Sequence, residues 1–202
     1  MKRAEITKRK ILETAELVFA EKGLYGSRVD EIAERAEVNK RMLYAHFGSK
    51  EQLYVAVLEE VYSRLARWED PLLSTRELDC EEAIHRIIRR SFEFLYRNPT
   101  FVKLVMWENL NEARYLEQSS VPNERGASLG LLRGSLRQGI EKGIFRSDID
   151  LDEMVLSINQ FCFSYFSNIH TFGQIMQIDF GKKEEAEKRA DHVADMIFKY
   201  LK

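Results

Sequence analysis

The sequence has few of the residues that interrupt helices or cross-link a chain. Its 202 residues include three prolines, ten glycines and two cysteines. Scarce proline and glycine favour a mostly helical chain. No apolar run approaches the ~20 residues that a bilayer-spanning helix needs, and no secretory signal is evident, so we expect no membrane association.

The two cysteines, Cys80 and Cys162, lie far apart and form no CxxC pair. We therefore expect free thiols in a reducing cytoplasm, where disulfides are rare. A disulfide or redox switch between these two residues is the alternative.

Motifs of catalysis and of metal binding are also missing. The sequence contains no zinc-like His/Cys spacing, no glycine-rich phosphate loop and no GxSxG. Its histidines are scattered: His46, His85, His170 and His192. We expect no catalytic residue, no metal and no cofactor. The alternative is an enzyme whose catalytic residues come together only when the chain folds.

Charge is unevenly distributed along the chain. Residues 1–50 hold 11 Lys and Arg against 8 Asp and Glu, a local charge of +3, and the remaining 152 residues hold 20 against 25, a local charge of −5. The two values sum to the net charge of −2. A basic head on an acidic body would orient the molecule on nucleic acid without coating the whole body with it.

Residues 27–50 carry the most informative pattern. Val29, Ile32, Ala33 and Ala36 make one apolar helical stripe. Ser27, with Asp30 three places on, has the spacing of a capping box and is expected to cap this helix.

A second short helix is expected at 40–47, after a break at 37–39. Asn39 is its predicted N-cap, and Leu43 and Phe47 are its predicted inward residues. Ser49 and Gln52 then form a second capping box, which opens a long helix.

The second short helix has basic and hydrogen-bonding residues on its outside and no acid between Lys40 and Lys50. Two short helices of this kind, joined by a tight turn, predict a helix-turn-helix. A helical hairpin with a merely basic surface is the alternative. The candidate DNA-binding residues are Ser27, Arg28, Asn39, Lys40, Arg41, Tyr44, His46 and Lys50.

Individual roles differ among these candidates. Arg41 would read guanine if it faces the groove and would only add affinity if it faces the backbone. Tyr44 and Lys50 are expected to contact phosphate, Lys50 as a clamp at a helix N-terminus, with a plain surface lysine as the alternative. Lys2, Arg3 and residues 8–10 form either a phosphate-contacting arm or a solvated tail.

Two segments resemble the DNA-binding domain of the TetR family of transcriptional regulators. I-L-E-T-A-E-L-V-F-A-E-K-G-L-Y-G resembles its first helix, and V-D-E-I-A-E-R-A-E-V-N-K-R-M-L-Y-A-H-F-G-S-K-E-Q-L resembles the rest. The match covers roughly residues 7–58. Arg41-Met42 departs from the small residues that are frequent there in the family.

The resemblance implies an all-α fold of about nine helices in two domains. Residues 1–50 would form the helix-turn-helix DNA-binding domain, and residues 51–202 a helical ligand-binding and dimerisation domain. Such proteins typically repress transcription as dimers on inverted repeats and release DNA when a small molecule binds. An activator, or a nonspecific DNA-binding or adaptor protein of the same fold, is the alternative function.

Periodicity and breaker residues place the expected elements. Gly23 should end the first helix as its C′ residue, and Asp70-Pro71 should end the fourth at an inter-domain joint, 70–79. Residues 1–5 are expected to be an arm and 115–125 a loop. The helices are expected at about 7–22, 29–36, 40–47, 50–67, 81–97, 99–114, 126–142, 150–172 and 183–201.

The eighth expected helix is apolar in nearly every direction from Phe161 to Phe166. A helix that is hydrophobic all round is buried on more than one side. We expect its own core on one side and a second subunit on the other. The resemblance implies that the last two helices pair with their symmetry mates in a four-helix bundle.

A small-molecule pocket is expected among helices five to eight. An aromatic or mostly apolar effector is the preferred class, and W-E-N-L-N-E-A-R-Y-L is similar to a segment of TetR regulators of pyrimidine and aromatic-compound degradation. Plain core packing or a helix-end role is the alternative for each candidate. The candidates are Phe92, Phe101, Met106, Trp107, Leu110, Asn111, Phe161, Tyr165, Phe166 and Asn168, with Asn109, Asn159 and His170 as further polar groups.

Overall fold

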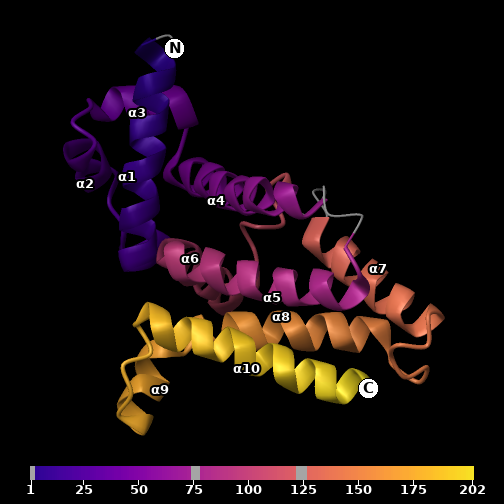
Figure 1. Cartoon of the computed structure of the whole chain (residues 1–202). Helices are drawn as coiled ribbons and strands as arrows, with labels where there is room; N and C mark the ends of the chain where they lie inside the picture. The colour runs from indigo at the N-terminus through magenta and orange to yellow at the C-terminus, as the bar shows by residue number, and fades with distance from the viewer. Residues whose placement is uncertain (1–2, 74–77, 122–126) are drawn as a thin grey trace. The chain divides into compact units, whose positions relative to one another are not determined.

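The computed structural model describes residues 3–73, 78–121 and 127–202, and these form helices and turns without a strand (Figure 1). The all-α prediction is confirmed. None of the described helices is long and apolar enough to cross a membrane. The helices are α1 (Arg3–Gly26), α2 (Val29–Arg35), α3 (Lys40–Phe47), α4 (Lys50–Leu73), α5 (Cys80–Arg97), α6 (Pro99–Leu110), α7 (Ala127–Glu141), α8 (Leu151–Ser167), α9 (Ile169–Met176) and α10 (Lys183–Leu201).

The first helix begins earlier than expected. Residues 3–5, predicted as part of an arm, belong to α1, while Lys2 lies outside the described residues. Gly23 does interrupt the helix as predicted, with φ 66° and ψ 176°. The chain then turns through Leu24–Gly26 toward α2.

The predicted end of the fourth helix at Asp70-Pro71 is wrong, because α4 runs on to Leu73. Tertiary contacts hold this last stretch of the helix. The indole Nε1 of Trp68 donates to the Arg90 carbonyl at 3.1 Å, and the Glu69 carboxylate accepts from the amide and hydroxyl of Ser128. The helix thus continues past a proline, which removes one helical hydrogen bond, while Trp68 and Glu69 tie it to α5 and α7.

Two other expected helices are shorter than predicted. α6 ends at Leu110, because Glu112 and Ala113 both take φ 57° and the buried Glu108 carboxylate accepts from the amides of Tyr115 and Leu116. The helix expected at 150–172 breaks at Asn168 into α8 and α9. The described residues therefore hold ten helices where about nine were expected.

The chain divides into two compact units. The first contains residues 1–64 and 100–124, and the second contains 65–99 and 125–202. Part of the predicted C-terminal domain, including α6, thus groups with the helix-turn-helix. The domain boundary at residue 50 stays a prediction.

The second unit is built around α5, which packs against α7, α8 and α10. Asp150 caps α8 as expected, since its side chain accepts from the amides of Asp152 and Glu153. Cys80 and Cys162 are buried free thiols. Burial raises the pKa of Cys162 to about 12, so its thiol is a poor nucleophile at neutral pH.

The first unit contains a buried ion pair between α1 and α4. Glu16 is 7% exposed, and its carboxylate accepts two hydrogen bonds from the guanidinium of Arg64. The hydroxyl of Thr100 donates to the same carboxylate. A buried carboxylate with three such donors is well compensated for its lost hydration.

We predict that Glu16→Ala lowers the free energy of unfolding by about 2 kcal/mol, measured by urea denaturation. Breaking a fully buried pair costs roughly 3–5 kcal/mol, and exposure reduces this value. Here the Arg64 side chain is 34% exposed.

Glu13→Ala is the matched control, since Glu13 lies on the same helix and pairs with Arg9 at 2.7 Å, both side chains being more than half exposed. It should change stability by less than about 0.5 kcal/mol. Equal effects of the two substitutions would contradict the importance of the buried pair.

Candidate nucleic-acid interface

The turn between α2 and α3 has the tight geometry of a helix-turn-helix. α2 ends at Arg35 with Ala36 as its C-cap, Glu37 takes a left-handed φ of 52°, and the Val38 amide donates back to the Ala33 carbonyl at 3.0 Å. Asn39 then caps α3, its side chain accepting from the Arg41 amide at 2.8 Å. The predicted N-cap is confirmed.

α3 is anchored by only two buried side chains, Leu43 and Phe47, as predicted. The opposite side of the helix faces solvent, with Lys40, Arg41 and Tyr44 exposed. His46 is half-buried, its ring tilted against Phe47 with 6.1 Å between centroids. Eight residues are too few for an isolated helix in water, so α3 depends on this anchoring.

Arg41 differs from Lys40, the cation beside it on α3. It is exposed and has no hydrogen bond or ion pair from its side chain within the described residues. Lys40 is paired with Asp30 of α2 at 2.7 Å, and this hydrogen bond raises the Lys40 pKa. The guanidinium of Arg41 is therefore available to a partner without breaking an existing contact.

Cations of α1 and α2 flank the same helix-turn-helix. Lys8 lies over the Phe47 ring, with 5.9 Å from its Nζ to the ring centroid, and Lys10 pairs with Glu37 of the turn. Arg28 is exposed at the start of α2. Positive charge thus lies around α3 as well as on it.

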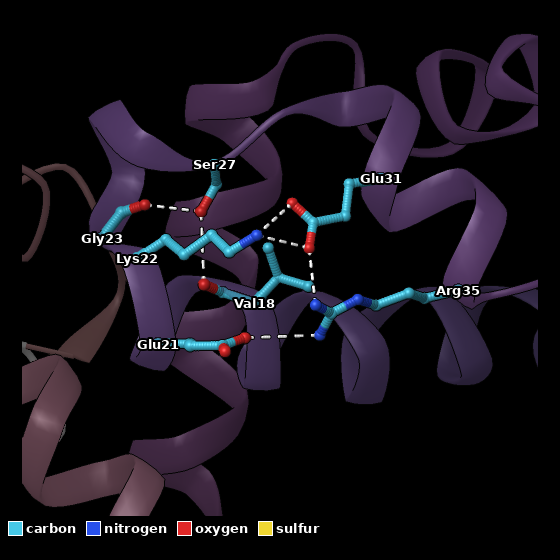
Figure 2. A network of polar contacts seen from close by, with 7 residues as sticks. All are labelled: Val18, Glu21, Lys22, Gly23, Ser27, Glu31 and Arg35. Atoms are coloured by element: carbon cyan, nitrogen blue, oxygen red, sulfur yellow. Dashed lines mark hydrogen bonds and ion pairs between the residues drawn. The ribbon is translucent and has the colours of Figure 1, made fainter.

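Ser27 does not cap α2, so the predicted first capping box is wrong. The N-cap of α2 is Arg28, without a side-chain hydrogen bond. Ser27 is 3% exposed, and its hydroxyl donates to the carbonyls of Gly23 at 2.6 Å and Val18 at 3.3 Å (Figure 2). It therefore ties the corner between α1 and α2 to the end of α1.

Lys50 braces the same corner from α4. Its ammonium donates to the carbonyls of Leu24 at 2.8 Å and Ser27 at 3.1 Å. These bonds occupy the group that was expected to clamp phosphate. The adjoining second capping box is present in part, since the Ser49 hydroxyl accepts from the Gln52 amide at 3.1 Å.

An ionic network joins α1 to α2 on the outside of the corner (Figure 2). The Glu31 carboxylate accepts from Lys22 at 2.7 and 2.8 Å and pairs with Arg35 at 2.6 Å, while Arg35 also reaches Glu21 at 3.4 Å. The hydrogen bond from Lys22 lowers the pKa of Glu31. The network orients α2, on which α3 packs.

α6 contacts the corner within the same unit. A Cβ built at Gly23 would lie 2.5 Å from the Trp107 indole, so the ring lies directly against this glycine. Nearby, the hydroxyls of Tyr25 and Tyr115 are 3.4 Å apart. The corner is thus held from α1, α4 and α6.

The predicted pocket residues belong to both compact units. In the first unit, Phe101 packs its ring against Tyr62 and Leu110 is 77% exposed. The amide of Asn111 bonds to its own helix at the Trp107 carbonyl. Met106 is also exposed, at 38%.

In the second unit, three of the candidates meet. The rings of Phe92, Tyr165 and Phe166 lie 5.0–5.7 Å apart between centroids, and Tyr165 donates to the Phe180 carbonyl at 3.0 Å. Burial raises the pKa of Tyr165 to about 12. Phe161 is 37% exposed.

The polar candidates nearby are occupied locally. Asn168 bonds to the Ser164 carbonyl and the Ser167 hydroxyl, and Asn159 bonds to the Val155 carbonyl. Asn109 likewise bonds to its own helix, at the Val105 carbonyl, and His170 is exposed.

A surface groove of about 680 Å³ runs beside this aromatic cluster, between α5 and α10. Phe92, Tyr96, Ala186 and Ala190 give it an apolar floor. Its rim carries charged pairs, including Arg89 with Asp191 at 2.7 Å. Among the described residues, no group of three His, Cys, Asp or Glu side chains could hold a metal ion.

Family models match most of the chain. A model of the bacterial regulatory proteins of the tetR family matches residues 11–57, and one of the tetracyclin repressor-like C-terminal domain matches residues 81–197. The chain belongs to the TetR family. The matched N-terminal segment contains the helix-turn-helix described above.

Two transcriptional repressors are similar to this chain, one of them over nearly its whole length. The transcriptional repressor NicS of Pseudomonas putida is 31% identical over 200 residues, covering 98% of this chain and 94% of that protein. The repressor KstR2 of Mycobacterium tuberculosis is 32% identical over 143 residues, 70% of each chain. Both are named as repressors.

Solved structures share the fold. The hemolysin II regulator HlyIIR superposes with a TM-score of 0.70 at 22% identity, covering 98% of both chains. FadR of Bacillus subtilis, in complex with stearoyl-CoA, superposes with a TM-score of 0.68 at 18% identity, covering 96% of this chain and 99% of that one. At these identities the likeness concerns the fold alone.

Several residues that support the interface were not predicted from the sequence. The sequence shows only ordinary surface charges at Lys22, Glu31 and Arg35, although Glu31 and Arg35 have the i, i+4 spacing of a helical ion pair. Trp107 was expected in a pocket. No local pattern signals its contact with Gly23, which is far away in the sequence.

We predict that Gly23→Ala destabilises the first unit by about 3 kcal/mol or more. The φ and ψ of Gly23 belong to a region that is essentially restricted to glycine and costs other residues of order 1–3 kcal/mol. The clash with Trp107 adds to this cost. Urea unfolding followed by tryptophan fluorescence and circular dichroism measures it.

Gly26→Ala is the control, because its Cβ would meet only Lys22 at 3.4 Å and Gly26 has no positive φ. Its effect should stay below about 1 kcal/mol. In the Trp107→Ala background, Gly23→Ala should cost less than in wild type, since only the backbone strain remains. Strict additivity of the two substitutions would contradict the contact.

Proposed function

We propose that this protein is a transcriptional repressor that binds an inverted-repeat operator as a homodimer in the cytoplasm. The observation that carries the proposal is the exposed face of α3, with Arg41 uncommitted, on a helix held by a braced corner. A two-fold dimer would place two such helices in successive major grooves, roughly 34 Å apart or somewhat more. The similarity to a repressor over nearly the whole chain supports repression rather than activation.

The side chains divide into those that contact DNA bases, those that contact phosphates and those that hold the helix-turn-helix in position. Arg41 contacts a base edge, because a guanidinium can donate two hydrogen bonds to guanine. Tyr44, Lys40 and Arg28 contact backbone phosphates from the exposed side of the motif. Ser27 and Lys50 position the motif through their bonds to the α1–α2 corner.

A small-molecule effector releases the operator in this proposal. It binds in the second unit near the Phe92, Tyr165 and Phe166 rings, which favour an aromatic or mostly apolar compound. α4 carries the signal, since its residues belong to both units. A coupling of about 1–3 kcal/mol would change operator affinity about 5- to 150-fold.

The dimer forms through the last long helices, α8 and α10. Leu156 of α8 is 50% exposed, and Tyr200 of α10 is 51% exposed, which leaves large side chains for a partner to cover. Each copy has one short recognition helix. Dimerisation places two of these helices on the DNA, and the two together give sequence specificity. One copy alone would bind weakly and mostly through nonspecific phosphate contacts.

We predict that Arg41→Ala relaxes sequence preference at one position of each half-site. The loss should be about 1–3 kcal/mol on the preferred base pair and little on the other three, because only the preferred pair loses its hydrogen bonds. Competition binding with single-substituted operator duplexes measures it. The parent duplex comes from the region upstream of the protein's own gene.

Arg137→Ala is the matched control, as Arg137 is an exposed arginine of α7 in the second unit. It removes the same charge and should leave both affinity and preference unchanged. Uniform weakening by Arg41→Ala on every duplex would assign Arg41 to the phosphate backbone instead. Wild-type binding as tight to random duplex as to the operator would favour a nonspecific DNA-binding protein.

A further inference from the structure

Met42 of α3 is a large apolar side chain that contributes little to the core of the first unit. It is 42% exposed, whereas Leu43 and Phe47 of the same helix are 0% and 7% exposed. Those two side chains are the ones that anchor α3. Single exposed apolar residues are common on protein surfaces, so exposure alone decides nothing. The position of Met42 on the helix is what gives its exposure a meaning.

Helix geometry places Met42 beside Ala45 and close to Arg41. An α-helix has 3.6 residues per turn, so residues three and four apart are neighbours on its surface. Ala45 is exposed, and it lies three residues from Met42 and four from Arg41. These three residues occupy the side of α3 that is turned away from Leu43 and Phe47. Met42 and Ala45 therefore form a small apolar patch beside the exposed guanidinium of Arg41.

The surroundings of this apolar patch are basic. α3 itself contains no aspartate or glutamate. Asp30 of α2 is paired with Lys40 at 2.7 Å, and Glu37 of the turn is paired with Lys10. An apolar patch within a basic surface suits the major groove of DNA, where base edges lie between two rows of phosphates.

The size of the patch decides what it can hold. A specific protein–protein interface buries about 1,000 Å² or more, and one methionine with one alanine is far too small for that. The patch matches a single methyl group. The 5-methyl of thymine is the apolar group that the standard base pairs present in the major groove. Methionine suits such a contact because its unbranched, polarisable side chain adapts to the shape of its partner.

We propose that Met42 and Ala45 contact the 5-methyl group of a thymine in each half-site of the operator. This inference rests on the proposed function and deepens it, because it names a base that α3 reads and the chemical group by which it is read. Arg41 and Met42 are adjacent in the chain. The thymine therefore belongs to a base pair neighbouring the one that Arg41 contacts.

Replacing thymine by uracil tests the contact, because uracil pairs with adenine in the same way and lacks only the methyl group. An operator duplex selected from a random-sequence library is resynthesised with uracil at one thymine position of both half-sites at a time. At the contacted position the Kd of the wild-type protein should rise about 15-fold, which is about 4-fold for each buried methyl. Fluorescence anisotropy at constant salt measures the Kd.

Met42→Ala should bind the thymine duplex more weakly than wild type and lose most of the penalty for uracil. Its Kd values for the two duplexes should differ by less than about 3-fold, because the methyl and Met42 act as a coupled pair. Circular dichroism checks that the variant is folded. Met42→Leu keeps an apolar side chain of similar size and should retain most of the discrimination.

Met176→Ala is the matched control, since Met176 is a 55% exposed methionine of α9 in the second unit. It should keep the full wild-type penalty for uracil. An equal penalty in Met42→Ala would overturn the role of Met42 and assign the methyl to other residues.

Two further outcomes separate this inference from the proposed function. A selected half-site without thymine, or a Kd that stays within about twofold at every uracil position, would overturn the thymine contact and leave operator binding standing. Failure of the library selection to enrich any sequence would overturn the proposed function itself.

Discussion

The hydrogen bond from the Ser27 hydroxyl to the Gly23 carbonyl, at 2.6 Å, helps to fix the corner on which the position of α3 depends. It fixes the corner where α1 turns toward α2, and α2 in turn carries α3. Lys50 donates to two further carbonyls of this corner, and the Trp107 ring covers Gly23. One corner therefore gathers contacts from α1, α4 and α6, all within one compact unit.

The corner matters because α3 is too short to be stable without its neighbours. Its eight residues bury only Leu43 and Phe47, so its orientation is set by its neighbours. Binding to DNA is sensitive to that orientation, since contacts to base edges require close geometry. A change in α4 or α6 would reach α3 through the corner, which is how a distant effector could alter operator affinity.

Much of the fold could be predicted because helix caps and apolar spacing are visible in short stretches of the sequence. Asn39, Asp150, Leu43 and Phe47 take the roles that their spacing indicated. Wrong predictions arose where tertiary contacts decide the outcome. Ser27 has the sequence of a cap, yet its hydroxyl finds buried carbonyls of α1. The pocket remains a prediction, and sequence spacing could not show that its candidate residues belong to two compact units.

We propose that α3, held by this corner, reads DNA sequence in pairs related by two-fold symmetry. The most direct measurement is selection of bound duplexes from a random-sequence library by the full-length protein, followed by sequencing. We predict enrichment of one inverted repeat whose half-site centres are one helical turn, or somewhat more, apart. Recovery of unenriched sequences, with affinity set by salt alone, would contradict it.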